Sequence, residues 1–434
     1  MKALIIGAAR SGSAITKLLL KQGYQCTLID SKSVGDKQLW KQWGVIIHEG
    51  LHPTSLWEED FDIIVKNPGI SHHDPFILGF IKRGHVILTE IEVAARYAQN
   101  YRYAAVTGTN GKTTTTSILG AMLKAKDASN EICGNIGVPL SDVVERHPYQ
   151  KIDIALEIAA FQLLGCFNLK PLVSVILNLT PDHLDVFTDT DEYYKAKCRI
   201  YQTQDKHDWF LKNIDDFNIL KYCEHVNSTV VTYSMEKAAD LCIKGQQVVL
   251  FDQMLFDSTT LKLKGRHNLQ NAMVAAAMAF KMGVDIQTIQ DVIVSFKGVE
   301  HRLEYVTTIE GVEYYNDSKG TTAESTVVAL QAFKQPVILL AGGYDKKTGF
   351  EALRPVLGQI RLLIAYGATK NQFKELYPEA YIVDTLQEAI HLAHQLSGAG
   401  DTVLFSPACA SYDQFHNYEE RGRLFKEWVL KLKN

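Results

Sequence analysis

Short apolar runs alternate with segments of helical periodicity along nearly the whole chain. The strand-like runs are Lys2–Ile6, Tyr24–Ile29, Phe61–Val65, Tyr103–Thr107, Ile152–Leu156, Leu172–Leu179, Pro336–Ala341, Arg361–Tyr366, Ala380–Val383 and Thr402–Phe405. Two neighbouring parallel strands need a long crossover connection between them, and a helix usually forms that connection. Strands that alternate with helices are therefore typical of parallel sheets. The alternation therefore predicts an α/β protein with mostly parallel sheets.

The 434 residues are long enough for several domains, and the pattern falls into three blocks. We expect a Rossmann-like domain over residues 1–92, a central domain with a mostly parallel sheet over residues 93–298, and a second Rossmann-like domain over residues 299–434. No Pro- or Ser-rich linker marks either boundary.

Composition excludes several classes of protein. Lys and Arg number 45 against 49 Asp and Glu, a formal net charge of −4, so we expect no nucleic-acid partner and no anionic membrane surface. The seven cysteines are scattered without a CxxC pair, which favours reduced thiols over a disulfide framework or a zinc site. No apolar run approaches the roughly 18 residues of a membrane-spanning helix. The first residues already belong to the predicted strand Lys2–Ile6 and form no separate apolar signal segment. We expect a cytoplasmic protein without membrane insertion.

The stretch Val106–Thr114 reads Val-Thr-Gly-Thr-Asn-Gly-Lys-Thr-Thr, and it follows one predicted strand and opens a helix. A glycine loop in this position directs backbone N–H groups at a phosphate, while the lysine reaches phosphate oxygens and the hydroxyl holds Mg²⁺. The first glycine of the general pattern is replaced by Val106, so the match is GxxGKT from Gly108. An ordinary turn with a surface lysine would leave the joint placement of the glycines, Lys112 and Thr113 unexplained. The stretch therefore predicts a nucleotide site.

Polar side chains follow two further predicted strands. Glu157 comes directly after the run from Ile152, and Asp182 and His183 follow the run from Leu172. Parallel sheets place their sites at the carboxyl ends of strands, and hard oxygen ligands beside a phosphate suit Mg²⁺. Histidine is less typical of magnesium than of zinc, and an Asp-His pair that only caps a helix stays an alternative.

Residues 7–12, Gly-Ala-Ala-Arg-Ser-Gly, are similar to a dinucleotide-binding turn with Ala9 at the middle glycine. That glycine lets the backbone approach a pyrophosphate closely, so Ala9 argues against an NAD site. Asp30, at the end of the second predicted strand, is placed to hold a ribose hydroxyl. On this motif alone, a Rossmann-like scaffold without a nucleotide stays open.

With these motifs assembled, the chain resembles the ATP-dependent Mur ligases of peptidoglycan synthesis over essentially its whole length. The segments that carry the resemblance are Thr107–Thr114 (TGTNGKTT), Gly134–Gly137 (GNIG), Glu157–Leu163 (EIAAFQL), Asn178–Asp185 (NLTPDHLD), Ala196–Tyr201 (AKCRIY), Gly265–Asn271 (GRHNLQN), His301–Glu304 (HRLE) and Asn316–Thr322 (NDSKGTT). The resemblance implies a first domain that binds a UDP substrate, a central phosphate-loop ATPase domain, and a third domain that contacts the amino acid and ATP.

The resemblance also implies roles for individual residues. ATP would be bound by Gly108, Thr109, Asn110, Gly111, Lys112, Thr113, Thr114, Asn271, Arg302 and Asp317. Two Mg²⁺ ions would be held by Thr113, Glu157, His183 and Lys197, the last as a carbamate formed with CO₂. The catalytic groups would be Lys112, His183, Lys197, Arg302 and Lys346. Without the resemblance, Lys197 would be interpreted as an exposed helix lysine.

Within the family, the segments Gly342–Lys346 and Ser406–Gly422 are similar to the members that add D-glutamate to UDP-N-acetylmuramoyl-L-alanine. The UDP substrate would be bound by Asp30, Ser31, Gly69 and Asn135, and D-glutamate by Lys319, Thr321, Lys346, Ser411 and Tyr418. Ala159 and Ala160 stand where relatives often have Ser-Ser, so a hydroxyl contact near the reacting centre is absent from this chain.

The implied reaction is amide ligation driven by ATP. The γ-phosphoryl group moves to the substrate carboxylate, the amine of D-glutamate attacks the acyl phosphate, and ADP and phosphate are released. We expect a monomer. Three alternatives stay open: a Mur-type ligase for another amino acid, a phosphate-loop protein that uses ATP as a switch, and a nicotinamide oxidoreductase, against which Ala9 argues.

Overall fold

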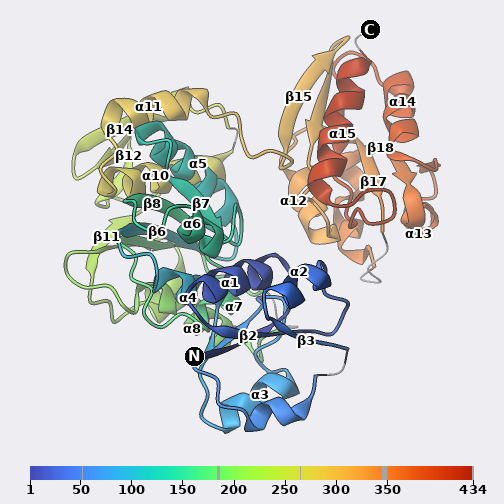
Figure 1. Ribbon diagram of the computed structural model, residues 1–434. Coiled ribbons are helices and arrows are strands. Elements are labelled where there is room, and N and C mark those ends of the chain that lie inside the picture. Colours follow the sequence, from blue (N-terminus) through green and yellow to red (C-terminus); the bar gives the residue numbers. More distant parts are fainter. Residues whose placement is uncertain (51, 183–185, 264, 345–348, 433–434) are drawn as a thin grey trace. The chain divides into compact units, whose positions relative to one another are not determined.

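The computed structural model describes residues 1–50, 52–182, 186–263, 265–344 and 349–432. The chain forms two compact units, Met1–Phe296 and Lys297–Asn434 (Figure 1). The first unit contains two sheets and the second contains one, and most strand pairs are parallel. The predicted α/β class is confirmed, while the domain boundaries after residues 92 and 298 stay predictions. None of the described helices has the length and hydrophobicity needed to cross a membrane.

The N-terminal sheet has five parallel strands in the order β3-β2-β1-β4-β5. Its elements are β1 (Lys2–Ile6), α1 (Arg10–Lys21), β2 (Gln25–Asp30), α2 (Lys37–Gln42), β3 (Ile46–Glu49), β4 (Ile63–Lys66), α3 (Pro75–Lys82), β5 (Ile87–Leu88) and α4 (Glu90–Ala95). The order reverses between β1 and β4, and sheets of this kind bind ligands beyond the carboxyl ends of strands at such a reversal. Helix α1 begins at Arg10, directly after Ala9, which has the extended backbone of an N-cap residue.

The central sheet has nine strands in the order β14-β13-β12-β11-β10-β9-β6-β8-β7, and only its β12-β13-β14 edge is antiparallel among the described pairs. Its elements are β6 (Tyr101–Thr107), α5 (Lys112–Lys126), β7 (Glu131–Gly134), α6 (Leu140–Arg146), β8 (Ile152–Glu157), α7 (Ala160–Leu163), β9 (Val173–Ile176), α8 (Thr190–Cys198), β10 (Trp209–Asn213), α9 (Phe217–Tyr222), β11 (Thr229–Tyr233), β12 (Leu241–Lys244), β13 (Gln247–Leu250), β14 (Gln253–Asp257), α10 (Arg266–Lys281) and α11 (Ile286–Ser295). Strand β9 ends before the predicted Leu179, because Asn178 turns to bond the loop after β6. Since β8, β6 and β9 are neighbours, the segments that follow them meet at one edge.

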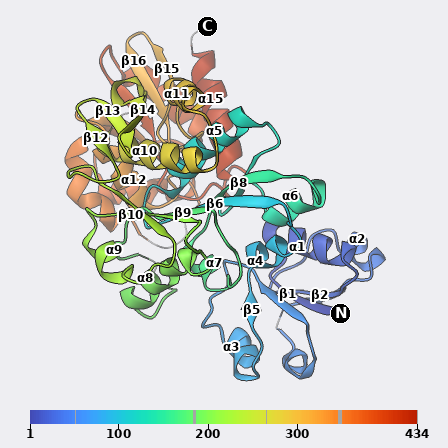
Figure 2. The same cartoon turned by 90° about the vertical axis from the view of Figure 1, so that its left-hand side faces the viewer.

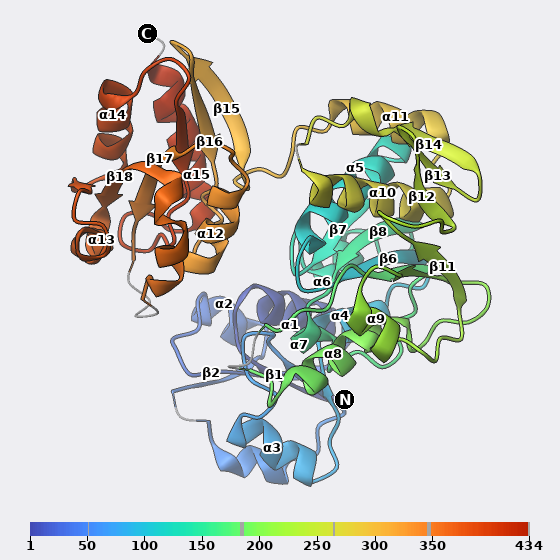
Figure 3. The same ribbon diagram turned by 180° about the vertical axis from the view of Figure 1, so that it is seen from behind.

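The sheet of the second unit has six strands in the order β15-β16-β20-β17-β18-β19, with only β15 and β16 antiparallel among the described pairs. Its elements are β15 (Glu304–Ile309), β16 (Val312–Asn316), α12 (Ala323–Gln331), β17 (Val337–Gly342), β18 (Ile360–Tyr366), α13 (Lys370–Leu376), β19 (Tyr381–Ile382), α14 (Leu386–Leu396), β20 (Thr402–Phe405) and α15 (Tyr418–Lys431). Helices α12 and α13 lie on one face of the sheet, and α14 and α15 lie on the other (Figure 3). Their apolar side chains form two separate cores with the strands.

One continuous core joins the two sheets of the first unit. It contains Leu19 of α1, Ile91 of α4, Val143 of α6 and Ile154 of β8, all fully buried. Helices α1, α4 and α6 accordingly lie side by side between the sheets (Figure 2). The opposite face of the central sheet packs on α5, α10 and α11 in a separate core. The shared core explains why the first two sheets form one compact unit.

Two buried carboxylates of α4 reinforce this junction. Glu90 Oε1 accepts hydrogen bonds from Ser141 N and Ser141 Oγ at the start of α6, both at 2.6 Å. Glu92 Oε2 accepts the backbone N–H groups of Phe167, Asn168 and Leu169 at 3.0–3.1 Å. Burial raises the pKa of Glu90 to about 7, although both bonds from Ser141 act to lower it. Glu90 is therefore a stabilising hydrogen-bond acceptor with an unfavourable buried charge.

Replacing Glu90 by Gln should keep an oxygen acceptor for Ser141 and remove that charge. The folded pKa of about 7 lies above the ordinary value of 4.5, so the charge penalty develops as the pH rises between these values. Above pH 7 we expect Glu90→Gln to be more stable to unfolding than the wild type by about 1–3 kcal/mol, and below about pH 4.5 the difference should vanish. Urea denaturation across this pH range measures it, with the exposed Glu58→Gln as control. A difference that does not depend on pH would contradict the assignment.

Candidate functional site

The loop between β6 and α5 is held by the segment that follows β9. Thr109 N donates to Asn178 O at 3.0 Å, Asn110 N donates to Asn178 Oδ1 at 2.8 Å, and Asn178 Nδ2 donates to Asn110 O at 3.0 Å. Gly111 has φ +86°, and a Cβ there would lie 2.6 Å from Asn271 Oδ1. This position requires glycine for both its conformation and its space. Asn178 thus fixes the loop that the sequence predicted as a phosphate site.

Two lysine ammonium groups meet at one carbonyl oxygen of this loop. Lys112 Nζ and Lys197 Nζ donate to Gly108 O at 2.8 and 2.9 Å. Lys197 is only 1% exposed, and its Nζ lies 4.5 Å from the centre of the Tyr193 ring. Burial, followed by the charge of Lys112, holds the pKa of Lys197 well below its ordinary value. The interpretation of Lys197 as an exposed helix lysine is therefore wrong.

Glu157 brings a buried carboxylate to the same edge of the sheet. Its Oε1 accepts a hydrogen bond from Asn135 Nδ2 at 2.7 Å, while Oε2 is buried and has no hydrogen-bond partner among the described residues. The charges of Glu157 and Asp182 both act on Lys197, raising its pKa against the larger effect of burial. An unpartnered buried carboxylate oxygen beside a phosphate-type loop fits a hard cation such as Mg²⁺.

Three of the four residues expected to hold Mg²⁺ lie in the part of the chain that the structure describes. Thr113 is buried near the start of α5, and Glu157 and Lys197 lie as described above, whereas His183 lies outside the described residues. Within the described ranges, no three side chains of His, Cys, Asp or Glu come together as a metal-binding group. Asn271, expected to bind ATP, accepts a hydrogen bond from Thr115 Oγ1 at 3.2 Å. It therefore lies against the phosphate loop and the first turn of α5.

The glycine turn of the N-terminal sheet is closed by Asp30. Asp30 Oδ2 accepts the N–H of Ala8 at 2.7 Å, and Oδ1 accepts the N–H of Lys32 at 2.8 Å. Asn67, after β4, donates through Nδ2 to Ser11 Oγ and accepts the N–H of Gly69, both at 3.0 Å. The structure thus brings Asp30 and Gly69 to the turn between β1 and α1, at the reversal of strand order, while Ser31 is exposed beside them.

In the second unit, Asp317 joins the ends of two neighbouring strands. Its Oδ2 accepts a hydrogen bond from Ser406 Oγ at 2.7 Å, and Oδ1 accepts the N–H of Leu303 at 3.2 Å. Burial raises the pKa of Asp317 to about 6, and both bonds, together with the charge of Arg302, act to lower it. His301 and Leu303 have positive φ values of 64° and 43°, so Arg302 lies between two residues in the left-handed region.

Arg421 of α15 is a fully buried arginine that the sequence analysis did not identify. Its guanidinium donates to Ser318 Oγ at 3.1 Å, Ser318 O at 2.8 Å, Cys409 O at 3.1 Å and Ala410 O at 3.0 Å. These acceptors lie after β16 and after β20, so one side chain fixes both loops. The Glu-Arg-Gly sequence gave no signal for this role, because a helical arginine is usually exposed.

Residues expected at an amino-acid pocket lie on these two loops. Ser318 Oγ donates to Tyr418 O at 2.8 Å, and Lys319 Nζ lies 6.0 Å from the centre of the Tyr418 ring. Thr321 N donates to Lys319 O at 2.9 Å, and Ser411 is buried one residue beyond Ala410. Bonds made by Ser318 and Arg421 therefore hold together the segments that carry these four residues. Lys346 lies outside the described residues.

Comparisons with known proteins agree with this architecture. The family model described as "Mur ligase middle domain" matches residues 106–279, and "Mur ligase, glutamate ligase domain" matches residues 301–409. The chain is 38% identical to the UDP-N-acetylmuramoylalanine–D-glutamate ligase of Lactobacillus gasseri and 39% identical to that of Lactobacillus acidophilus, covering 99% of this chain and 97% of each relative. The solved UDP-N-acetylmuramate–alanine ligase of Thermotoga maritima shares the fold with a TM-score of 0.60, at 19% identity and full coverage of both chains.

Replacing Arg421 by Met should remove the guanidinium donors from the buried carbonyl oxygens of Ser318 and Cys409, while Ala410 O keeps the N–H of Tyr344 at 2.9 Å. We expect the free energy of unfolding to fall by about 3 kcal/mol, since each unpaired buried polar group costs roughly 1–3 kcal/mol and relaxation recovers a part. Urea denaturation measures the change. The matched control is Arg423→Met, an exposed position on the same helix, for which a change under about 0.5 kcal/mol is expected. Equal losses in the two variants would contradict the role of Arg421.

Proposed function

The chain belongs to the Mur ligase family, and we propose that it joins the amine of D-glutamate to the carboxylate of UDP-N-acetylmuramoyl-L-alanine, converting ATP to ADP and phosphate. The observation that carries this function is the convergence of Lys112 and Lys197 on Gly108 O, beside the buried carboxylate of Glu157. Two anions, a carboxylate and a triphosphate, repel each other unless positive groups lie between them. A cationic loop with an adjacent acidic ligand meets that requirement.

The phosphate loop performs the first part of the reaction. Backbone N–H groups of Gly108–Thr114 and the N-terminus of α5 would bind the phosphates of ATP, and Lys112 would move from the Gly108 carbonyl to a phosphate oxygen. Thr113, Glu157, His183 and Lys197 would hold two Mg²⁺ ions, which would neutralise charge on the phosphates. Asn271, Arg302 and Asp317 would complete ATP binding, with Arg302 available for a bidentate contact to phosphate.

We infer that Lys197 carries a carbamate in the active enzyme. The ammonium would lose one proton to become the neutral amine, and the amine and CO₂ would form the carbamate with loss of a second proton, which changes a cation into an anion. In the structure the Lys197 ammonium shares its carbonyl acceptor with Lys112, so two like charges lie close together, and that of Lys197 is buried. A carbamate would replace this repulsion by attraction to Lys112 and would supply oxygen ligands for a cation. This explains why a lysine is suitable at a metal-binding position.

The remaining substrates would bind at the other two sheets. Asp30, Ser31 and Gly69 at the N-terminal turn, together with Asn135, would bind the UDP substrate. Lys319, Thr321, Lys346, Ser411 and Tyr418 would bind D-glutamate, whose carboxylates suit the ammonium and hydroxyl groups of this set. The amine would attack the acyl phosphate, and phosphate would leave from the tetrahedral intermediate. We propose that the enzyme acts as a cytoplasmic monomer.

Phosphate release with Mg-ATP, UDP-N-acetylmuramoyl-L-alanine and a panel of amino acids tests this function, with each component omitted in turn. Release that requires both the UDP compound and D-glutamate supports the proposal. Release with a different amino acid would keep the ligase chemistry and overturn the assignment of the glutamate pocket. ATP binding without release would favour the alternative of an ATP-dependent switch protein.

Lys197→Ala should abolish most ligase activity, with kcat lowered by about 100-fold or more, because a metal-binding group is lost. A small carboxylate such as acetate should restore part of that activity by supplying the missing oxygen ligand. Steady-state phosphate release with and without acetate measures both effects. Lys195→Ala is the matched control, since Lys195 lies on the same helix with a 69% exposed side chain. Full activity of Lys197→Ala, or a loss that acetate does not reverse, would contradict the carbamate.

A further inference from the structure

Two thiols lie together at the end of α8, one of them on the residue that follows Lys197. Cys198 is the last residue of α8, and Cys223 follows α9. Their sulfur atoms are 3.7 Å apart, and Cys198 Sγ also lies 3.7 Å from the carbonyl oxygen of Tyr222. All seven cysteines of the chain are reduced. The sequence gave no indication of this pair, since the two positions are far apart along the chain.

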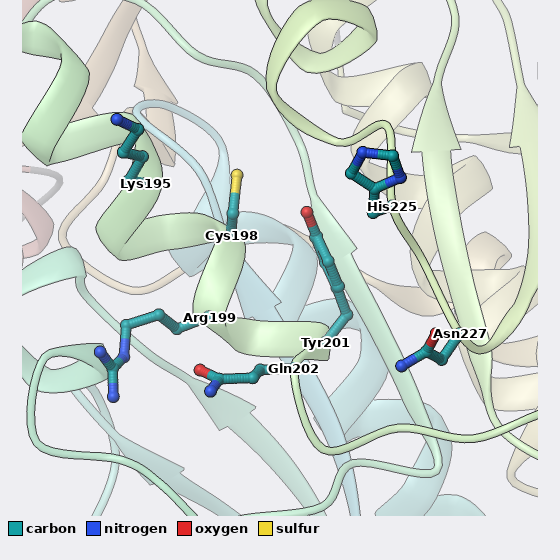
Figure 4. Close-up of a pocket in the computed structure, with 7 residues that line it drawn as sticks. All are labelled: Lys195, Cys198, Arg199, Tyr201, Gln202, His225 and Asn227. Carbon is teal, nitrogen blue, oxygen red and sulfur yellow. The ribbon is translucent and has the colours of Figure 1, made fainter.

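The two cysteines differ in access to solvent. Cys223 is fully buried, whereas Cys198 is half-buried and lines a cavity of about 310 Å³. Lys195, Tyr201 and His225 line the same cavity. In Figure 4 the Cys198 side chain projects from the end of α8 on the same side as the Tyr201 hydroxyl, while Arg199 points away. A small polar oxidant can therefore reach Cys198 from the cavity, and Cys223 lies behind it as a second thiol.

Closing this pair would disturb the candidate active site. A disulfide has an S–S distance of about 2.05 Å, so the sulfurs would have to approach each other by about 1.7 Å. Cys198 is the immediate neighbour of Lys197, whose Nζ is held at 2.9 Å from Gly108 O. A shift of about 1 Å in a catalytic group is enough to lower a rate by a large factor. Oxidation at Cys198 is thus coupled to the position of Lys197 through the last turn of α8.

We propose that Cys198 and Cys223 are a reversible oxidation site that closes to a disulfide on reaction with a hydroperoxide and thereby lowers ligase activity. The Cys198 sulfur attacks one peroxide oxygen, the O–O bond breaks, and the other oxygen leaves as water or an alcohol with the thiol proton. Cys223 then displaces the hydroxyl of the Cys198 sulfenic acid, which leaves as water, and the S–S bond forms. The two thiols lose two electrons and two protons in total, and the peroxide gains them. The effect on activity rests on the proposed ligase function, while the disulfide itself does not.

The test treats the full-length protein with hydrogen peroxide and analyses non-reduced peptides by mass spectrometry. We expect a peptide pair joined through Cys198 and Cys223, lighter by two hydrogens than the separate peptides and removed by dithiothreitol. Ligase activity, first established for the reduced protein, should fall by about tenfold or more on oxidation and return with dithiothreitol. Measuring the reduced protein first separates failure of the ligase assignment from failure of this proposal.

Three variants make the test specific. Cys198→Ser and Cys223→Ser should form no joined peptide, and Cys223→Ser should lose less activity than the wild type after the same treatment. Cys223→Ala serves if a buried serine prevents folding. Cys242→Ser, at a buried position on β12, is the matched control and should still form the joined peptide. Oxidation of Cys198 without a bond to Cys223, or a complete disulfide with unchanged ligase activity, would overturn the proposal.

Discussion

The carbonyl oxygen of Gly108 accepts hydrogen bonds from two lysine ammonium groups, and much of the first unit is arranged around this contact. An ammonium buried as deeply as that of Lys197 is costly unless it is hydrogen-bonded and faces opposite charge. The Gly108 carbonyl, the Tyr193 ring, and the charges of Glu157 and Asp182 offset part of that cost, and burial with the charge of Lys112 still holds the pKa of Lys197 well below its ordinary value. Gly108 and Asp182 follow β6 and β9, Glu157 ends β8, and Tyr193 lies on α8, so the contact depends on several neighbouring elements of the central sheet. The geometry and the charge of this site therefore change when either lysine changes its protonation or its position.

The second unit also contains buried charged side chains, in this case a carboxylate, Asp317, as well as a cation, Arg421. Asp317 is a buried carboxylate that is kept in place by Ser406 and the backbone of Leu303. Arg421 is a buried cation that binds carbonyl oxygens and a hydroxyl, and its charge also lowers the pKa of Asp317. The two side chains hold the loops after β16 and β20 in fixed positions. Rigid loops at strand ends hold polar side chains in the fixed geometry that a binding site requires.

Local sequence patterns predicted the class of fold and about half of the described strands, among them β6, β8 and β9 of the central sheet. Strand β1 and strand β20 have the predicted bounds, because each is a short apolar run between polar turns. The glycine loop of Val106–Thr114 also lies where its pattern placed it, since the conformation of Gly111 is a local requirement. The pattern did not predict the antiparallel edge β12-β13-β14 or the shared core of the first two sheets. The shared core depends on packing between distant segments, which periodicity does not report. The β12-β13-β14 edge is instead a pair of local hairpins, and its short strands were missed.

Residue types at strand ends, such as Glu157 and Asp317, were identified from the sequence because parallel sheets gather their carboxyl ends at one edge. Lys197, Arg421 and the Cys198–Cys223 pair show what sequence patterns leave undetermined. A lysine or arginine on a polar helix has the same local sequence whether it is exposed or buried, and two cysteines 25 positions apart carry no sign of contact. The sequence by itself determined the α/β alternation, the phosphate loop and the chemical types available for catalysis. The tertiary structure alone decided which of those groups share an acceptor, a charge environment or a cavity, because these properties arise from atoms that meet only when the sheets pack.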